Sequence, residues 1–203
     1  VIEGAGHNMA LERPAEIVEC GPAAGVIGAA KMTRPGLENI LTFDMGGTTA
    51  KASIIEEGRL VKTDEYEIGG GISLSSRLVK GGGYALKLPV IDISEVGAGG
   101  GSIVWFDKAG ALKVGPHSAG ADPGPVCYAQ GGTDPTVTDA NVVLGYINPH
   151  SLAGGTVPIE AGKAEEAIRT QVADPLHQDL MEAAYGVHTV SNATMMRAIK
   201  AVS

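Results

Sequence analysis

The sequence predicts a mixed α/β fold, with a sheet in the middle of the chain and helices toward both ends. Of the 203 residues, 44% are hydrophobic, which is enough to build a core. Apolar extended runs dominate the middle of the chain, and runs with helical spacing dominate its ends. The 30 glycines, beside only 4% aromatic residues, indicate loops whose backbone shapes a site.

Composition excludes several classes of protein. The net charge of −8 and the lack of a basic stripe argue against nucleic-acid binding. No apolar run reaches the roughly 20 residues of a membrane-spanning helix. The chain has only two cysteines, Cys20 and Cys127, so a disulfide framework is not expected. We therefore expect a reducing, cytoplasmic compartment. Because the chain starts at Val1 and a helical pattern is still running at its end, we expect a fragment.

The elements are predicted from local patterns, in chain order. After a short strand at Pro14–Cys20, a helix opens with Pro22 in its first turn. A Gly- and Pro-rich loop spans residues 115–135, and Gly186 is a point where the last helix would break or kink. The further strands predicted are Ile40–Asp44, Ala50–Glu56, Arg59–Tyr66, Leu88–Ile93, Ile103–Asp107 and Leu112–Val114. The further helices predicted are Thr138–Tyr146, Ile159–Val172 and Leu180–Ala201.

The main chemical signal is a strand, a glycine turn and a second strand over Leu41–Ile55. The first strand delivers Asp44, whose carboxylate could hold Mg²⁺ through water. Two glycines follow, in a turn that we expect only glycine to tolerate easily, and such a turn can present N–H groups and hydroxyls to a phosphate. A plain hairpin with an aspartate at its turn is the alternative. The proposed phosphate ligands are Gly46, Gly47, Thr48, Thr49 and Lys51.

A second glycine-rich stretch covers Asp92–Ser102. It is not a dinucleotide fingerprint, because the last required glycine falls on Ser102 and a strand follows where a helix is needed. It remains a candidate for a second loop that faces phosphate or substrate. Asp92 and Glu95 precede it as candidate metal ligands or acid/base groups, the alternative being plain solvated carboxylates. The loop residues named as nucleotide-binding are Gly99, Gly100, Gly101 and Ser102.

Four motifs together resemble the hydantoinase A/5-oxoprolinase family, from about residue 14 to the end. They are CGPAAGVIGAA, FDMGGTTAK, GAGGGSIVW and VGPHSAGADPGPVCYAQGGTDPTVTDANVVLG. The resemblance implies an actin/Hsp70-like ATPase lobe with a ribonuclease H-like sheet, present here in part. It also implies three segments: a first connecting-helix region at 14–34, a sheet core with glycine loops at 39–158, and a helical segment with the second connecting helix at 159–203.

The resemblance further implies ATP-dependent hydrolysis of a cyclic amide, of the hydantoin or 5-oxoproline type, through phosphorylation of its carbonyl. ATP and Mg²⁺ would be bound, with Asp44 as the metal-associated carboxylate and Asp92 and Glu95 as further catalytic residues. Asp122 and Asp139 are additional candidates for a general base. The implied partners are the cyclic amide and a hydantoinase B-like subunit or domain, in a homo- or hetero-oligomer.

Three alternatives stay open at this point. They are an acetone-carboxylase-type subunit, a small-molecule kinase of the same superfold, and a non-catalytic nucleotide-binding module. Many hydantoinase-like members carry a His in the stretch that corresponds to Asp92–Glu95, and this chain has none there. The residues therefore leave the exact substrate open.

Overall fold

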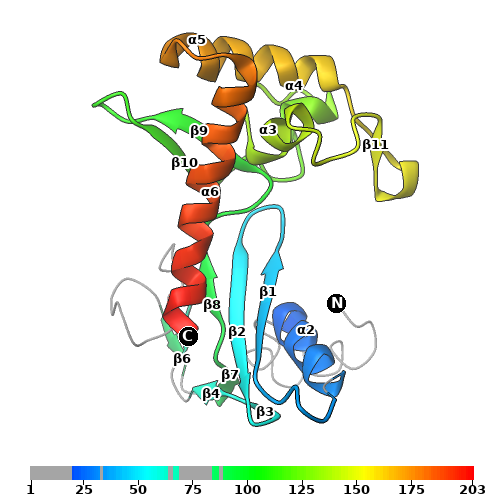
Figure 1. The fold of residues 1–203 in the computed structure, drawn as a ribbon, viewed down its shortest axis with the longest axis vertical. Coiled ribbons are helices and arrows are strands. Elements are labelled where there is room, and N and C mark those ends of the chain that lie inside the picture. Colours follow the sequence, from blue (N-terminus) through cyan, green and yellow to red (C-terminus); the bar gives the residue numbers. More distant parts are fainter. Residues whose placement is uncertain (1–19, 33, 64–65, 69–83, 87–88) are drawn as a thin grey trace. The chain divides into compact units, whose positions relative to one another are not determined.

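The computed structural model describes residues 20–32, 34–63, 66–68, 84–86 and 89–203, and this part is mixed α/β as the sequence predicts (Figure 1). The chain divides into two compact units. The first contains the described residues of 20–44, 51–96 and 197–203, and the second contains 45–50 and 97–196. None of the helices in the described part is both long and apolar enough to cross a membrane.

The first unit combines one helix, α2 (Cys20–Lys31), with a small sheet. In this sheet the strand order is β1-β2-β3, and β8 also pairs with β2. Two further antiparallel pairs join β4 to β7 and β5 to β6. The strands are β1 (Ile40–Met45), β2 (Ala50–Glu56), β3 (Arg59–Leu60), β4 (Lys62–Thr63), β5 (Tyr66–Ile68), β6 (Tyr84–Leu86), β7 (Val90–Ile91) and β8 (Ser94–Val96).

Most local predictions for this unit are confirmed. The helix after Cys20 forms with Pro22 in its first turn, and β1 and β2 match their predicted runs within one residue. The prediction for Leu88–Ile93 is too long, since only Val90–Ile91 is strand and Leu88 lies outside the described residues. The strand predicted at Pro14–Cys20 also lies outside them, apart from Cys20, which begins α2 instead.

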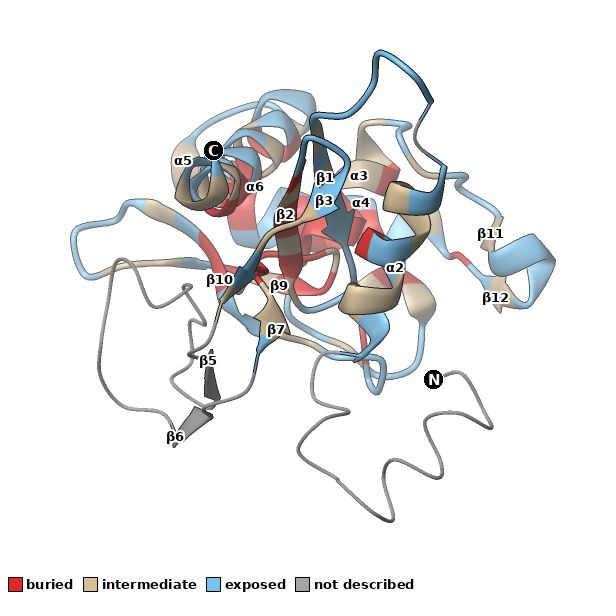
Figure 2. Cartoon of the chain, turned by 90° about the horizontal axis from the view of Figure 1, so that it is seen from below, coloured by how far each residue is buried: buried red, intermediate tan, exposed pale blue. Residues whose placement is uncertain are grey.

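Strands β1 and β2 differ sharply in burial. Most of β2 is buried or half-buried, whereas most of β1, at the end of the strand order, is exposed (Figure 2). The exposed residues of β1 include Leu41 and Phe43. Val26 of α2 packs with Ile55 and Ile93 into the core of the first unit. Apolar burial against α2 therefore holds β2, while the outer edge of β1 has no strand partner among the described residues.

The second unit is built from one hairpin and a set of helices. Strands β9 (Ser102–Phe106) and β10 (Leu112–Ser118) pair antiparallel, as predicted, with Leu112 opposite Phe106. The remaining elements are η2 (Val126–Tyr128), α3 (Val137–Val143), β11 (Ser151–Leu152), η3 (Ala153–Gly155), β12 (Val157–Pro158), α4 (Ala161–Ile168), η4 (Arg169–Ala173), α5 (Asp174–Leu176) and α6 (Leu180–Val202). The last residues of α6, from Arg197 on, belong to the first unit.

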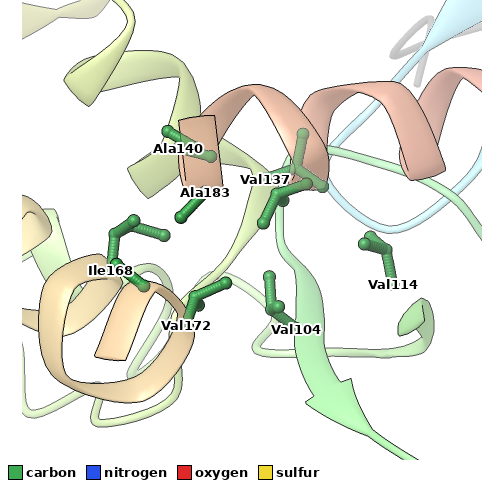
Figure 3. Close-up of a cluster of buried hydrophobic side chains, with 10 residues drawn as sticks. Val104, Val114, Val137, Ala140, Ile168, Val172 and Ala183 are labelled. Carbon is green, nitrogen blue, oxygen red and sulfur yellow. The ribbon is translucent and has the colours of Figure 1, made fainter. Parts of the chain in front are cut away.

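The core of the second unit lies where the hairpin meets the helices. Figure 3 shows side chains from both strands and from α3, α4, η4 and α6 directed at one another. All are small or branched aliphatic residues, so the helices approach the hairpin closely. The labelled members are Val104, Val114, Val137, Ala140, Ile168, Val172 and Ala183.

Helix α6 runs without interruption through Gly186, so the prediction of a break or kink there is wrong. A glycine in a helix costs about 1 kcal/mol relative to alanine. Burial offsets this cost, because Ala183, Ala184 and Val187 on both sides of Gly186 are completely buried. A Cβ at Gly186 would meet Leu112 at 3.7 Å, an ordinary contact.

Helix α3 begins with a capping box. The Thr136 hydroxyl accepts a hydrogen bond from the Asp139 amide, and the Asp139 carboxylate accepts one from the Thr136 amide at 2.9 Å. The same carboxylate accepts bonds from the amides of Val126, at 3.2 Å, and Cys127, at 2.8 Å, and it is completely buried. Asp139 therefore ties helix α3 to the preceding loop, and this bonding gives it a structural role rather than that of a general base.

We expect Asp139→Asn to lower the local stability around α3 by about 2–4 kcal/mol, because an amide group would face the donors that the carboxylate now satisfies. Hydrogen exchange of the α3 amides in the complete protein measures this loss. The exposed Asp134 offers a matched control, and Asp134→Asn should leave the exchange unchanged. Equal protection in the two variants would contradict the anchoring role.

Candidate functional site

The predicted phosphate turn lies at the hairpin tip, which we define as residues 46–49, between β1 and β2. The Gly46 amide donates to the Thr49 carbonyl at 2.9 Å and closes the turn. Gly46, Gly47 and Thr48 are exposed. Neither glycine has a positive φ, so the expectation that only glycine tolerates this backbone is wrong.

The second glycine-rich stretch supports the tip from within the same unit. We call residues 97–102 the glycine run. The Gly100 amide donates to the Gly46 carbonyl at 3.0 Å, and the Gly101 amide donates to the Gly47 carbonyl at 2.6 Å. A Cβ on Gly99 would lie 2.7 Å from the Gly46 and Gly47 carbonyl oxygens, which is too close for any side chain. The run is therefore glycine-rich because two backbones meet there.

The glycine run is itself held on its other side by helix α3. The Gly100 carbonyl accepts hydrogen bonds from the Thr138 amide at 2.7 Å and from its hydroxyl at 2.9 Å. The Gly99 amide donates to the buried Ser102 hydroxyl at 2.8 Å, and the Ser102 amide donates to the Gly99 carbonyl. The amides of the four residues predicted to bind nucleotide here are thus engaged within the chain.

Two donors at the hairpin tip remain open. The amides of Gly47 and Thr48 have no acceptor among the described residues. Nothing within the described structure lies within 4 Å of a Cβ placed on Gly47. The Thr48 hydroxyl donates to the Ser118 hydroxyl oxygen at 3.4 Å. Exposed amides and hydroxyls gathered at one turn are suited to an anion, phosphate above all.

The first unit brings together two other predicted site residues. Lys51, on β2, forms an ion pair with Glu95, on β8, with 3.0 Å between Nζ and Oε1. The two side chains are only 17% and 19% exposed. Lys51 therefore already has an anionic partner within the chain, and Glu95 has a cationic one.

Asp92 occupies a buried position in the same unit. It is 8% exposed, and its Oδ1 atom has no hydrogen-bond partner among the described residues. Its backbone carbonyl accepts a bond from the Ser53 hydroxyl at 2.7 Å. The hydroxyl of Ser94, completely buried, likewise has no partner in the described part of the chain. An unpartnered buried carboxylate oxygen is costly and is typical of a site that takes a further group.

Two further predicted candidates lie at the surface. Asp44 and Asp122 are exposed. The described residues contain no group of three or more His, Cys, Asp or Glu side chains that could hold a metal ion. Burial raises the pKa of the Cys127 thiol, and the charge of Asp139 raises that pKa further, so Cys127 is no nucleophile.

Sequence reasoning missed two residues of this arrangement, Thr138 and Ser118. Thr138 lies inside the motif TVTD, residues 136–139, whose Thr-x-x-Asp spacing marks a capping box and could have revealed the helix start. Ser118 lies 70 residues from Thr48 in the chain, and no local pattern predicts that contact.

The profile of the family described as hydantoinase/oxoprolinase matches residues 5–203. The chain belongs to this family. An uncharacterised protein of Methanocaldococcus jannaschii is 47% identical over 195 residues, which cover 96% of this chain and 28% of that protein. The caprolactamase subunit alpha of Pseudomonas jessenii is 39% identical over 193 residues, which cover 95% of this chain and 26% of the relative.

Two solved structures of the family share the fold. A nucleotide-free structure of acetone carboxylase, from a study of ATP-dependent acetone carboxylation, is 34% identical with a TM-score of 0.71 and covers 85% of this chain and 23% of its own. The crystal structure of the ATP-dependent caprolactamase from Pseudomonas jessenii is 39% identical with a TM-score of 0.67 and covers 90% of this chain and 24% of its own. The chain spans about a quarter of the length of these relatives.

We expect Gly99→Ala to displace the hairpin tip, because the added methyl group would meet two backbone carbonyls that cannot both move away. Hydrogen exchange at the amides of Gly46, Gly100 and Gly101, whose bonds hold the tip, should become at least about tenfold faster, which corresponds to roughly 1.4 kcal/mol of lost local stability.

Gly162, in helix α4, is the matched control, since nothing lies within 4 Å of a Cβ there. Gly162→Ala should leave the exchange at the tip unaltered. Unchanged exchange in Gly99→Ala as well would mean that the tip does not depend on the glycine run.

Proposed function

We propose that this chain is the phosphate-binding part of an enzyme that hydrolyses a cyclic amide with ATP. Membership of the hydantoinase/oxoprolinase family supports the reaction class. The similarity to a caprolactamase that is described as ATP-dependent supports both the cyclic amide and the nucleotide. The hairpin tip is the observation that carries the proposal, because it leaves backbone donors open at an exposed turn.

The donor set of the tip fits the terminal phosphates of ATP. Gly47 and Thr48 offer two neighbouring amides, and the hydroxyl of Thr48 lies beside them. Neither backbone conformation nor packing among the described residues requires glycine at position 47. The missing side chain leaves room for a ligand to approach the backbone, as phosphate loops need. Gly46, Thr49 and Lys51 belong to the same proposed binding segment.

Mg²⁺ is proposed as the companion ion, with the exposed carboxylate of Asp44 as its protein ligand. Mg²⁺ at nucleotide sites keeps several waters and takes phosphate oxygens, so one or two carboxylates suffice. The ion would supply positive charge against the phosphates during phosphoryl transfer.

Cyclic amides resist water because the ring nitrogen is a poor leaving group. In the proposed reaction the terminal phosphoryl group of ATP moves to the amide oxygen and ADP leaves. Water then attacks the carbon, and the carbon–nitrogen bond breaks as the ring nitrogen takes up a proton, which leaves an acyl phosphate. A second water releases phosphate from it and gives the open-chain amino acid. The chain contributes placement and charge stabilisation. Asp92, with an unpartnered oxygen, and Glu95, paired with Lys51, are the proposed proton-transfer residues of the first unit.

We further propose that the complete protein works with a hydantoinase B-like subunit or domain, within a homo- or hetero-oligomer. The caprolactamase relative is itself named as a subunit. A cytoplasmic location is proposed because Cys20 and Cys127 are free thiols, as in reducing compartments.

The second candidate function is an acetone-carboxylase-type subunit, which the TM-score of 0.71 to that enzyme favours. ATP-dependent ring opening of hydantoin, 5-oxoproline or caprolactam, set against carboxylation of acetone, separates the two reactions.

We expect Gly47→Val in the complete protein to weaken ATP binding by about 100-fold or more, because the side chain would occupy the space before the open amides. Isothermal titration calorimetry with ATP and Mg²⁺ measures the change. Gly162→Val, away from the tip, is the control and should bind as the wild type does. Unchanged affinity in Gly47→Val would favour the plain-hairpin interpretation.

Asp44→Ala should abolish ATP-dependent turnover without unfolding the protein, because the proposed Mg²⁺ ligand is removed from an exposed position. Turnover measured over a Mg²⁺ titration tests this, with circular dichroism as the check on folding. Asp134→Ala removes an equally exposed carboxylate and should retain activity. Turnover that survives in Asp44→Ala would remove Asp44 from the site.

A further inference from the structure

Ser118 lies where the end of β10 meets the glycine run. It is paired with Ser102 across the β9–β10 hairpin, after a register shift that follows Val114. Its neighbour Ala119 donates an amide hydrogen bond to the Gly101 carbonyl at 2.8 Å. A Cβ on Gly101 would lie 2.9 Å from the Ser118 Oγ atom. The backbone therefore fixes the Ser118 hydroxyl against the loop that supports the hairpin tip.

The hydrogen bonds of this hydroxyl leave one group unused. The Ser118 Oγ atom accepts from the Gly120 amide at 3.1 Å and from the Thr48 hydroxyl at 3.4 Å. A serine hydroxyl has two acceptor sites and one donor hydrogen. Both acceptor sites are used within the chain, and the O–H has no acceptor among the described residues. Because the side chain is half-buried, this donor is both positioned and accessible.

The open donor belongs to the same edge as the open amides of the tip. The Thr48 hydroxyl connects the two sides directly, and the Gly101 amide connects them through the Gly47 carbonyl. Two amides from the hairpin and one hydroxyl from the end of β10 are thus open donors at the tip. A group that presents several anionic oxygens, such as a terminal phosphate, can accept from all three.

We propose that Ser118 is a further phosphate-binding residue, whose hydroxyl donates to a terminal phosphate oxygen of the nucleotide at the hairpin tip. This inference rests on the proposed function, since it places the ligand at the same tip. It adds a second wall to the site, formed by the end of β10.

The test compares Ser118→Ala with Ser118→Thr in the complete protein, by calorimetry with ATP and with adenosine in the presence of Mg²⁺. Ser118→Ala should bind ATP about tenfold more weakly and adenosine as the wild type does, because one bond to a charged oxygen is lost. Ser118→Thr retains the hydroxyl and should bind ATP as the wild type does. Without ligand, hydrogen exchange at the amides of Gly46, Gly100 and Gly101, whose bonds hold the tip, should be the same in all three proteins.

Asn148 is the matched control, because its side chain accepts a hydrogen bond from the amide of His150, two residues later, at 2.9 Å. Ser118 accepts one from the amide of Gly120 in the same way. Asn148→Ala should leave ATP binding unchanged. ATP affinity within twofold of the wild type in Ser118→Ala, beside lost binding in Gly47→Val, would overturn the role of Ser118 alone. Faster exchange at the tip in Ser118→Ala would also overturn it, by assigning the effect to the turn. Wild-type affinity in Gly47→Val, or a wild type that binds no ATP, would overturn the proposed function and this inference together.

Discussion

Two hydrogen bonds between backbones, from the amides of Gly100 and Gly101 to the carbonyls of Gly46 and Gly47, determine the form of the candidate site. They exist only because residue 99 has no side chain to hold the strands apart. The glycine run is held in turn by Thr138 at the start of α3, and that helix start is secured by the buried carboxylate of Asp139. A chain of hydrogen bonds thus connects the exposed hairpin tip to the completely buried carboxylate of Asp139.

The backbone amides of the glycine run and of the hairpin tip fall into two groups. The amides of Gly100 and Gly101 are bonded to the tip, whereas those of Gly47 and Thr48 have no acceptor in the described structure. A site built this way can present fixed dipoles to an incoming anion without rearranging. Preorganised donors of this kind supply much of the stabilisation in phosphoryl transfer. The arrangement explains why so many glycines serve one turn.

Local patterns predicted the two strands of the phosphate hairpin nearly to the residue, because apolar, extended runs on both sides of a glycine turn are typical of strands. They misjudged what depends on tertiary contact. The glycines of the tip were expected to be required by the backbone conformation, but the steric demand falls on Gly99, about a quarter of the chain further along the sequence. Asp139 resembled a catalytic carboxylate until its donors were visible. The contact of Thr48 with Ser118 joins residues that no short window contains.

The exposed outer strand β1 has a practical consequence for handling this polypeptide. The side chains of Leu41 and Phe43 are exposed, and the outer edge of β1 pairs with no strand in the described part of the chain. Such an edge strand can pair with other extended chains, since each added strand satisfies backbone amides and carbonyls and covers apolar surface. Produced by itself in bacteria, the 203-residue polypeptide should self-associate into insoluble material unless that edge is capped or made charged.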